Sequence, residues 1–229
     1  MAVREFEISA YSVVLLGNFN PVIFTPNWFE KWGLLTEDEA ANAEVSVIHP
    51  DITRFAAGGL TVQVELNRFS ASGTQSAIKI KDFVLKTFRD YLSHTPIRSI
   101  GINREVHYRL PNVGARVKLG RSLAPLAPWG EFGREMEEKP GKEVGGLLSI
   151  TMHRQKEGTE IKGHVQATVQ PSAIIPRNVG VFFQINDHSE ALDESNSSEV
   201  ILDLLDSSFE ESIKQSEKII DQVLIGIEA

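Results

Sequence analysis

Cysteine is absent from this chain of 229 residues, which excludes disulfides, thiolate metal ligands and cysteine nucleophiles. The chain also lacks any apolar run of about eighteen residues, the length at which a membrane-spanning helix is suspected. Its first residues lack the basic and then apolar pattern of a secretory signal. Together these absences predict a cytoplasmic protein without a membrane segment.

Known catalytic motifs are also missing. The sequence contains no dinucleotide fingerprint, no phosphate-binding loop, no HExxH and no GxSxG. Asn186–Glu190 brings metal-capable side chains together, but a solvated acidic loop has the same composition and is the preferred interpretation. We therefore expect no metal site and no cofactor, and the sequence argues weakly against an enzyme.

The formal net charge of −8 is distributed unevenly along the chain. Residues 187–229 contain twelve acidic residues and two lysines, whereas residues 79–121 contain ten basic and three acidic residues. This separation predicts that an acidic element faces a basic one, within the chain or across a dimer. Because the total charge is acidic and no basic tail is present, a nucleic-acid partner is not expected. A local basic groove over Lys79–Arg121 is the alternative, and binding through it would weaken steeply with salt.

Two segments have the apolar spacing of long amphipathic helices. In Gln75–Ser93, apolar residues recur at steps of three and four. Thr74 or Ser76 can cap its start, and Pro96 prevents its continuation. Glu199–Ile227 predicts a second long helix, which is acidic in composition.

After Pro96 the apolar period changes from near four to two, which predicts a half-buried strand that ends at Leu110. Its polar face carries Asn103, Glu105, His107 and Arg109. If His164 lies on a neighbouring strand, its side chain joins this face, and His107 with Glu105 is a plausible acid–base pair. These five residues are candidates for binding a ligand or partner, and an ordinary exposed sheet face is the alternative interpretation.

Arg104 interrupts the alternation because it falls on the apolar face of this strand. One interpretation is a β-bulge or a strand end where the side chain reaches water. The other is a buried guanidinium that pairs with a carboxylate in a ligand site. Arg104 is therefore a further candidate.

Aromatic residues are dense between Phe19 and Trp32, where Pro26–Trp32 predicts a short helix with Pro26 at its first position. Trp28 and Trp32 either close one end of the core as a cap, or line a pocket or a partner-binding patch. They complete the set of candidate residues.

The remaining polarity pattern predicts strands joined by hairpins, such as the one at Gly58-Gly59. Further strands are expected at 5–16, 44–49, 52–57, 60–68, 148–153, 161–169 and 181–185. Residues 110–118 are predicted to continue the sheet, and residues 187–198 to form a polar loop.

The predicted fold class is α+β, with antiparallel sheet covered by the two long amphipathic helices. Residues 1–118 form an N-terminal half with the aromatic cap and the first helix. Residues 119–229 form a C-terminal half that ends in the acidic helix, and both are expected in one compact unit. Because each half runs strand, hairpin, strand and helix, an internal duplication is a hypothesis based on topology alone.

The strand Ile97–Arg104 follows a helix that ends at Phe88–Leu92. This order resembles a sporadically distributed, uncharacterised bacterial family of about this length, which has an I-x-x-I-G-x-x-x-x-N-R strand after a helix. In this chain the Asn-Arg pair follows Gly101 more closely. The strand, loop and long helix from Val179 to Ile227 are also similar. The resemblance implies repeated strand–helix halves and implies no catalytic residue.

Two functions follow as hypotheses. The first is a non-catalytic protein-interaction or assembly protein of bacterial or phage origin, which forms a homo-oligomer or binds a protein partner. The second is a small-molecule-binding α+β domain with a pocket between sheet and helix, for which hydrolytic activity is a further option.

Overall fold

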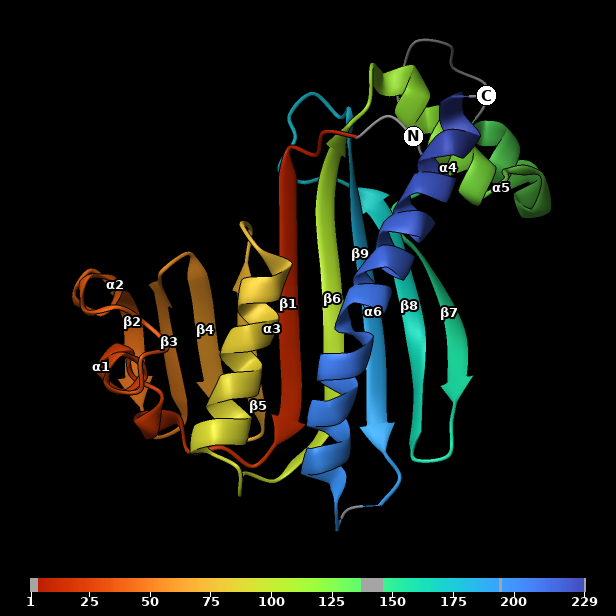
Figure 1. Cartoon of the computed structure of the whole chain (residues 1–229). Helices are drawn as coiled ribbons and strands as arrows, with labels where there is room; N and C mark the ends of the chain where they lie inside the picture. Colours follow the sequence, from red (N-terminus) through yellow and green to blue (C-terminus); the bar gives the residue numbers. More distant parts are fainter. Residues whose placement is uncertain (1–3, 137–145, 194, 229) are drawn as a thin grey trace.

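The computed structural model describes residues 4–136, 146–193 and 195–228. It contains one antiparallel sheet of nine strands in the order β2-β3-β4-β5-β1-β6-β9-β8-β7 (Figure 1), so the α+β class is confirmed. The strands are β1 (Ile8–Gly17), β2 (Glu44–His49), β3 (Ile52–Ala57), β4 (Leu60–Glu65), β5 (Arg68–Gly73), β6 (Ile97–Arg109), β7 (Ile150–Glu157), β8 (Ile161–Pro171) and β9 (Gly180–Ala191).

The α-helices of the described residues are α1 (Pro26–Lys31), α2 (Glu37–Ala41), α3 (Ala77–Lys86), α4 (Val113–Leu123), α5 (Gly130–Glu135) and α6 (Ser197–Glu228). Three short helical turns accompany them, namely η1 (Pro21–Ile23), η2 (Thr87–Tyr91) and η3 (Ala127–Trp129). None of these helices is both long enough and apolar enough to cross a membrane.

Two central strands, β1 and β6, join the two sides of the sheet, because they pair with each other along most of their length. On one side β1 also pairs with β5, the last strand of the β2–β5 meander. On the other side β6 pairs with β9, the last strand of the β7–β9 meander. Each meander therefore returns its final strand to the centre.

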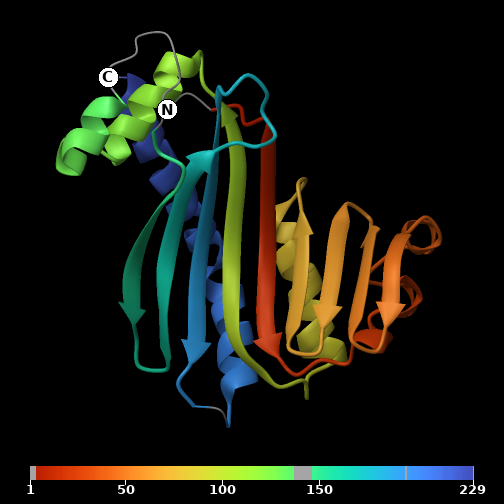
Figure 2. The ribbon, with the colours of Figure 1, turned by 180° about the vertical axis from the view of Figure 1, so that it is seen from behind.

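The helices that cover the sheet lie on one face, where α3 contacts β1 and β5, and α6 contacts β6 and β9 (Figure 1). Seen from behind in Figure 2, the opposite face is crossed by none of the described helices. We call this uncovered side the open face. An antiparallel sheet can leave one face to water, because its other face alone buries the apolar side chains.

The core lies between the sheet and its helices, in two clusters. The larger cluster contains Phe69, Phe88 and Phe209, and the smaller one contains Phe183 and Ile220. Since α6 contributes to both clusters, it packs against both halves of the chain. The predicted boundary between residues 118 and 119 lies inside α4.

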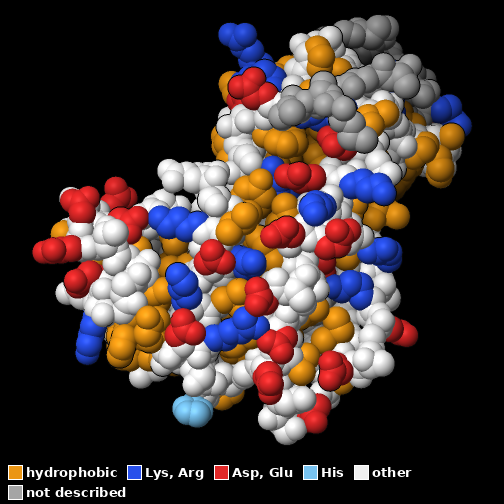
Figure 3. Space-filling model, in the orientation of Figure 1, with side chains coloured by type: hydrophobic (Ala, Val, Ile, Leu, Met, Phe, Trp, Pro, Cys, Tyr) orange, Lys and Arg blue, Asp and Glu red, His pale blue; other side chains and the backbone are white. Residues whose placement is uncertain are grey.

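The acidic helix α6 faces basic side chains of the segment around α3. Arg89 donates hydrogen bonds to Asp203 at 2.5 Å and to Asp206 at 2.7 Å, and Lys81 lies 3.7 Å from Asp206. Figure 3 shows acidic and basic side chains interleaved across this surface. The expected pairing of acidic and basic segments thus occurs within the chain. Solvent screens exposed pairs of this kind, so they orient the helices more than they stabilise them.

Helix starts follow the sequence signals. The Thr25 side chain caps α1, Thr36 and Glu39 form a capping box at α2, and Ser76 caps α3. The regular α-helix of this region is shorter than predicted, because after Lys86 the chain continues as the π-helical turn η2.

Two local predictions are wrong. Residues 110–118 do not continue the sheet, because Asn112 accepts from the Ala115 backbone N–H at 2.9 Å and starts α4. Residues 187–191 are not a loop, because they extend β9 and pair with both β6 and β8. In addition, the predicted strand 60–68 spans a turn, since β4 ends at Glu65 and β5 begins at Arg68.

Candidate functional site

The open face gathers most of the candidate residues. Asn103, Glu105 and His107 project to it from β6, and His164 projects to it from β8, with β9 between the two strands. The register places the side chains of one cross-strand row in the order Ser12, Asn103, Asn186, Gln166 and His153. This central row of amide, hydroxyl and imidazole groups contains no formal charge at neutral pH.

Asn186 at the middle of the row has an amide oxygen that is buried and that accepts no hydrogen bond from the described residues. A Cβ atom at Gly101, on the adjacent strand, would lie 3.0 Å from this oxygen. The absence of a side chain at Gly101 therefore leaves space for the Asn186 amide group. The Asn103 amide donates a long hydrogen bond of 3.4 Å to the Gly101 carbonyl.

Glu105 and His107 each have a hydrogen-bond partner on this face, Gln184 and Ser172 respectively. They do not form a hydrogen bond with each other. The Gln184 amide donates to Glu105 at 2.7 Å. His107 Nδ1 lies 2.8 Å from Ser172 Oγ, and its ring stacks on Phe182 with 4.6 Å between ring centroids. Burial lowers the pKa of His107, and the nearby Glu105 carboxylate opposes this effect.

Three imidazoles form a ladder across β7, β8 and β9. The ring centroids of His153 and His164 are 4.7 Å apart, and those of His164 and His188 are 5.0 Å apart. Burial lowers the pKa of His188, and the neighbouring His164 adds to this effect. In the described ranges, no three His, Asp or Glu side chains are arranged to hold a metal ion.

Of these three histidines, only His164 is predicted from the sequence as a candidate. The polarity pattern predicts a loop at His188, and it does not connect His153 with His164. The signal that could have found them is the hairpin turn after Glu157, since counting back from it places His153 diagonally across from His164. Pairing of β8 with β9 then places His188 directly opposite His164.

Arg109 lies at the end of β6, where it forms an ion pair with Glu7. The Arg109 guanidinium holds the pKa of the Glu7 carboxyl below its usual value. Both side chains are exposed, so the pair is screened by solvent and marks the border of the open face.

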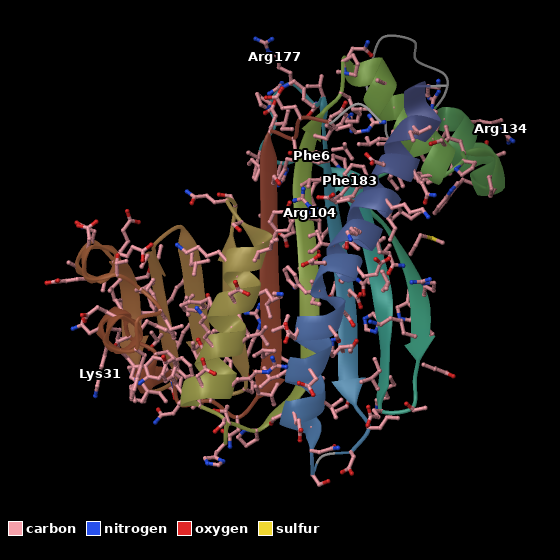
Figure 4. The ribbon with its side chains drawn as sticks, in the orientation of Figure 1. Phe6, Lys31, Arg104, Arg134, Arg177 and Phe183 are labelled. Carbon is pink, nitrogen blue, oxygen red and sulfur yellow. The ribbon has the colours of Figure 1, made fainter. Side chains whose placement is uncertain are left out.

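Arg104 lies on the opposite, helix-covered face, and it is 1% exposed. Its guanidinium stacks over the Tyr11 ring at 4.3 Å and faces the Phe6 ring at 5.4 Å. It donates to the Ala10 and Glu105 carbonyls at 3.3 and 3.1 Å. Figure 4 shows Arg104 and Phe6 together beside β6.

A carboxylate does approach Arg104. Glu217 Oε1 of α6 lies 3.6 Å from Arg104 Nε, which is an ion-pair distance but beyond hydrogen-bond length. Burial lowers the pKa of Arg104, and Tyr11 and Glu217 oppose this effect. The buried guanidinium of the second interpretation is present, and its surroundings are packed side chains and carbonyls.

Trp28 and Trp32 lie in the aromatic cap at the β2 side of the molecule. Trp28 is half-buried against Phe24 and Phe29. Trp32 is 40% exposed and stacks on Tyr91 with 4.7 Å between ring centroids. The cap therefore closes the core and also leaves two aromatic rings at the surface, far in the sheet order from the imidazole ladder.

A cleft of about 110 Å³ lies between α4 and the ends of β8 and β9. Its apolar wall includes Leu119, Val169 and Val181, and its lining also includes Arg116 and Arg121. None of the candidate residues predicted from the sequence lines this cleft. One of its walls is α4, and the sequence predicts a strand over residues 110–118, where α4 begins.

Comparison with known proteins adds no relative to this description. The chain matches no protein-family model, and the curated proteins contain no match to it. The fold and the site define the class of the protein, which is an α+β protein with a nine-stranded antiparallel sheet covered by helices on one side.

Proposed function

We propose that this chain is a non-catalytic protein-interaction or assembly protein that uses the open face as its docking surface. The observation that carries the proposal is a nine-stranded sheet with one face free of described helices. This face presents a central row of neutral hydrogen-bonding side chains, which can pair with amide and hydroxyl groups of a protein surface without desolvating a charge.

The dimensions of the open face support this proposal. Nine strands at a spacing of about 4.8 Å span about 40 Å, and even the six-residue strands β2–β5 are about 20 Å long. The face is therefore at least as large as the roughly 800 Å² that each partner buries in a standard protein interface. Small side chains on β1, Ala10 and Ser12, keep the centre of the face low enough for close approach.

The test uses a long charged side chain at the centre of the open face. Gln166→Arg should abolish recovery of the partner that docks on the open face, because the introduced guanidinium would be buried at the interface against neutral groups without a carboxylate partner. Gln222→Arg, an exposed position on α6, is the matched control and should have no effect. The measurements are light scattering at two salt concentrations and recovery of the partner that co-purifies from the native host.

A co-purifying partner does not by itself support the proposal. The proposal is supported if Gln166→Arg loses this partner and Gln222→Arg retains it. A protein that stays monomeric at both salt concentrations and has no co-purifying partner would contradict the proposal. Equal binding by the two variants would move the docking surface away from the open face.

The second candidate function, a small-molecule-binding domain with hydrolytic activity as an option, is favoured by the cleft beside α4. Its apolar wall and two arginines suit an apolar molecule with an anionic group. Decanoate is a suitable probe. It should raise the melting temperature of the wild type and not that of Leu119→Trp, which fills the cleft.

The order of the elements also supports a proposed internal duplication, covered by two long helical segments, α3 with η2 and α6. In the first repeat β1 pairs with the last strand of the β2–β5 meander and α3 follows, and in the second repeat β6 pairs with the last strand of the β7–β9 meander and α6 follows. This relates β1 to β6, β5 to β9 and α3 to α6. These repeats divide the chain before β6 and not at residues 118 and 119. A cytoplasmic location and a bacterial or phage origin belong to the same proposal and come from the sequence alone.

A further inference from the structure

The two edges of the sheet differ in how well they are protected. β2 at one edge has six residues, and its register with β3 shifts between Val45 and Val47. β7 at the other edge has eight residues that pair with β8 without any shift. Bulges and short strands are the usual protection of a free edge, so β2 is protected and β7 is not.

The outer side of β7 is accessible. All its residues except Ile150 and Lys156 are exposed, and among the described residues no strand pairs with its outer edge. Figure 2 shows β7 at the rim of the sheet. An edge of this length presents unpaired N–H and C=O groups to any strand that can match them.

The hairpin between β7 and β8 shows which backbone groups point outward. The Gly158 N–H donates to the Ile161 carbonyl at 2.9 Å, so this pair is hydrogen-bonded. Because bonded and non-bonded pairs alternate in an antiparallel ladder, the even-numbered residues of β7 bond to β8. The backbone groups of Thr151, His153 and Gln155 therefore point away from the sheet.

The charged side chains of β7 do not block pairing at its outer edge. Lysine on an edge strand usually prevents pairing, but the Lys156 ammonium is held inward by an ion pair with Asp187 and a 2.9 Å hydrogen bond to Ser189. The side chains beside the outward backbone groups are neutral at Thr151 and Gln155. β7 contains no proline.

The strand is self-complementary in one antiparallel register. In an antiparallel pair of β7 strands, the residues that lie opposite each other point to the same face of the sheet. The two-fold axis that relates the two copies must therefore pass through a residue of β7 and not between two residues. Two positions of the axis, at His153 and at Arg154, pair most of the strand with its copy. An axis at Arg154 would oppose two arginines, whereas an axis at His153 pairs Thr151 with Gln155 of the second copy.

We propose that two copies of this chain associate through β7 in the antiparallel register centred on His153. About six backbone hydrogen bonds form, and the two sheets become one. On the helix side, Met152, which is 66% exposed, is covered by the aliphatic part of Arg154 of the second copy. On the open face, the imidazole ladder continues from His153 to its symmetry mate. This inference rests on the proposed function, because it specifies how the chain assembles.

The absence of cysteine allows a direct test by cross-linking. His153→Cys places one thiol at the two-fold axis, where opposed Cα atoms are about 5.5 Å apart, within disulfide range. Mild oxidation should convert most of this variant into a covalent dimer. Gln155→Cys is the matched control, because its symmetry mate lies about 13 Å away along the strand, and it should stay monomeric on a denaturing gel.

A second variant tests the non-covalent dimer. His153→Pro removes an outward N–H group and keeps every hydrogen bond between β7 and β8, which an edge strand tolerates. Sedimentation of the wild type should give twice the chain mass of 25.4 kDa, and His153→Pro should give the single mass. A single cooperative melting transition would show that the variant is folded, and its melting temperature should fall only by the stabilisation that the dimer adds.

The outcomes separate this inference from the proposed function. If the wild type dimerises but His153→Cys does not cross-link, or cross-links no better than Gln155→Cys, the β7 interface is wrong and the assembly proposal stands. If the wild type is monomeric but its partner is lost in Gln166→Arg, the interface is again wrong and the docking proposal stands. A monomer without any partner overturns both.

Discussion

At the scale of single residues, Arg104 and the histidines of the open face show opposite ways of accommodating polar groups. Arg104 keeps its charge under α6 because two carbonyls, two aromatic rings and a nearby carboxylate replace water. The imidazoles can instead avoid charge, since a neutral ring is easier to bury than an imidazolium. This difference makes His107 and His188 sensitive to pH, because burial lowers the pKa of both imidazoles.

His188 should make the protein less stable as the pH falls from 7.5 to 5.5. Its pKa is lowered in the folded state, first by burial and then by His164. Below the ordinary histidine pKa of about 6.5 the unfolded chain takes up a proton that the folded chain resists, so the free energy of unfolding decreases. Urea denaturation at both pH values measures the loss.

His188→Gln should reduce this loss of stability, because the variant has no proton to take up at this position. His107, whose pKa is also lowered by burial, keeps part of the effect in the variant. His49→Gln, at an exposed position on β2, is the control for the loss of an imidazole elsewhere in the chain. An equal loss in wild type and His188→Gln would contradict the assignment.

At the scale of elements, close backbone approach between β8 and β9 depends on Gly163. A Cβ atom at this position would lie 2.1 Å from the His188 carbonyl oxygen. The backbone oxygen cannot move away without breaking the pairing of β8 with β9, so Gly163→Ala should lower the free energy of unfolding by about 1–3 kcal/mol. Chemical denaturation gives this value.

The same substitution elsewhere provides the control. Gly226 lies in α6 with no atom within 4 Å of its hypothetical Cβ, so Gly226→Ala should be neutral or stabilising by up to about 1 kcal/mol. Destabilisation of both variants to a similar degree would show that the effect is not steric.

Two elements show why local patterns misassigned parts of the chain. Val113, Ala115 and Val117 alternate as in a strand, but Ala115, Leu119 and Leu123 also have helical spacing, and these three pack on the second core cluster. Residues 187–191 carry polar groups on both faces because Asp187 pairs with Lys156 beneath the sheet. A strand that is polar on both faces has the composition of a loop.

At the scale of the whole molecule, the two predicted halves depend on each other. Strand β6 of the first half pairs with β9 of the second, and Leu205 and Phe209 of α6 belong to the larger core cluster together with residues of β1 and β5. A fragment of residues 1–118 should therefore lack cooperative unfolding, since it exposes this core. Circular dichroism during heating is the measurement, and a sharp melting transition of the fragment would contradict the expectation.

The sequence alone determined which residues share a face. Alternation along one strand placed Asn103, Glu105 and His107 together and put Arg104 on the other side, because the direction of a side chain in a strand depends only on its own backbone. In the same way Pro26 marked the start of α1, and the choice of Thr74 or Ser76 marked the start of α3.

Only the tertiary structure decided which strands are neighbours. It placed β9 between β6 and β8, stacked His153, His164 and His188, and left β7 at a free edge. The pairing of distant strands depends on the packing of the whole sheet against α3 and α6. The polarity pattern within a single strand carries no information about this packing free energy.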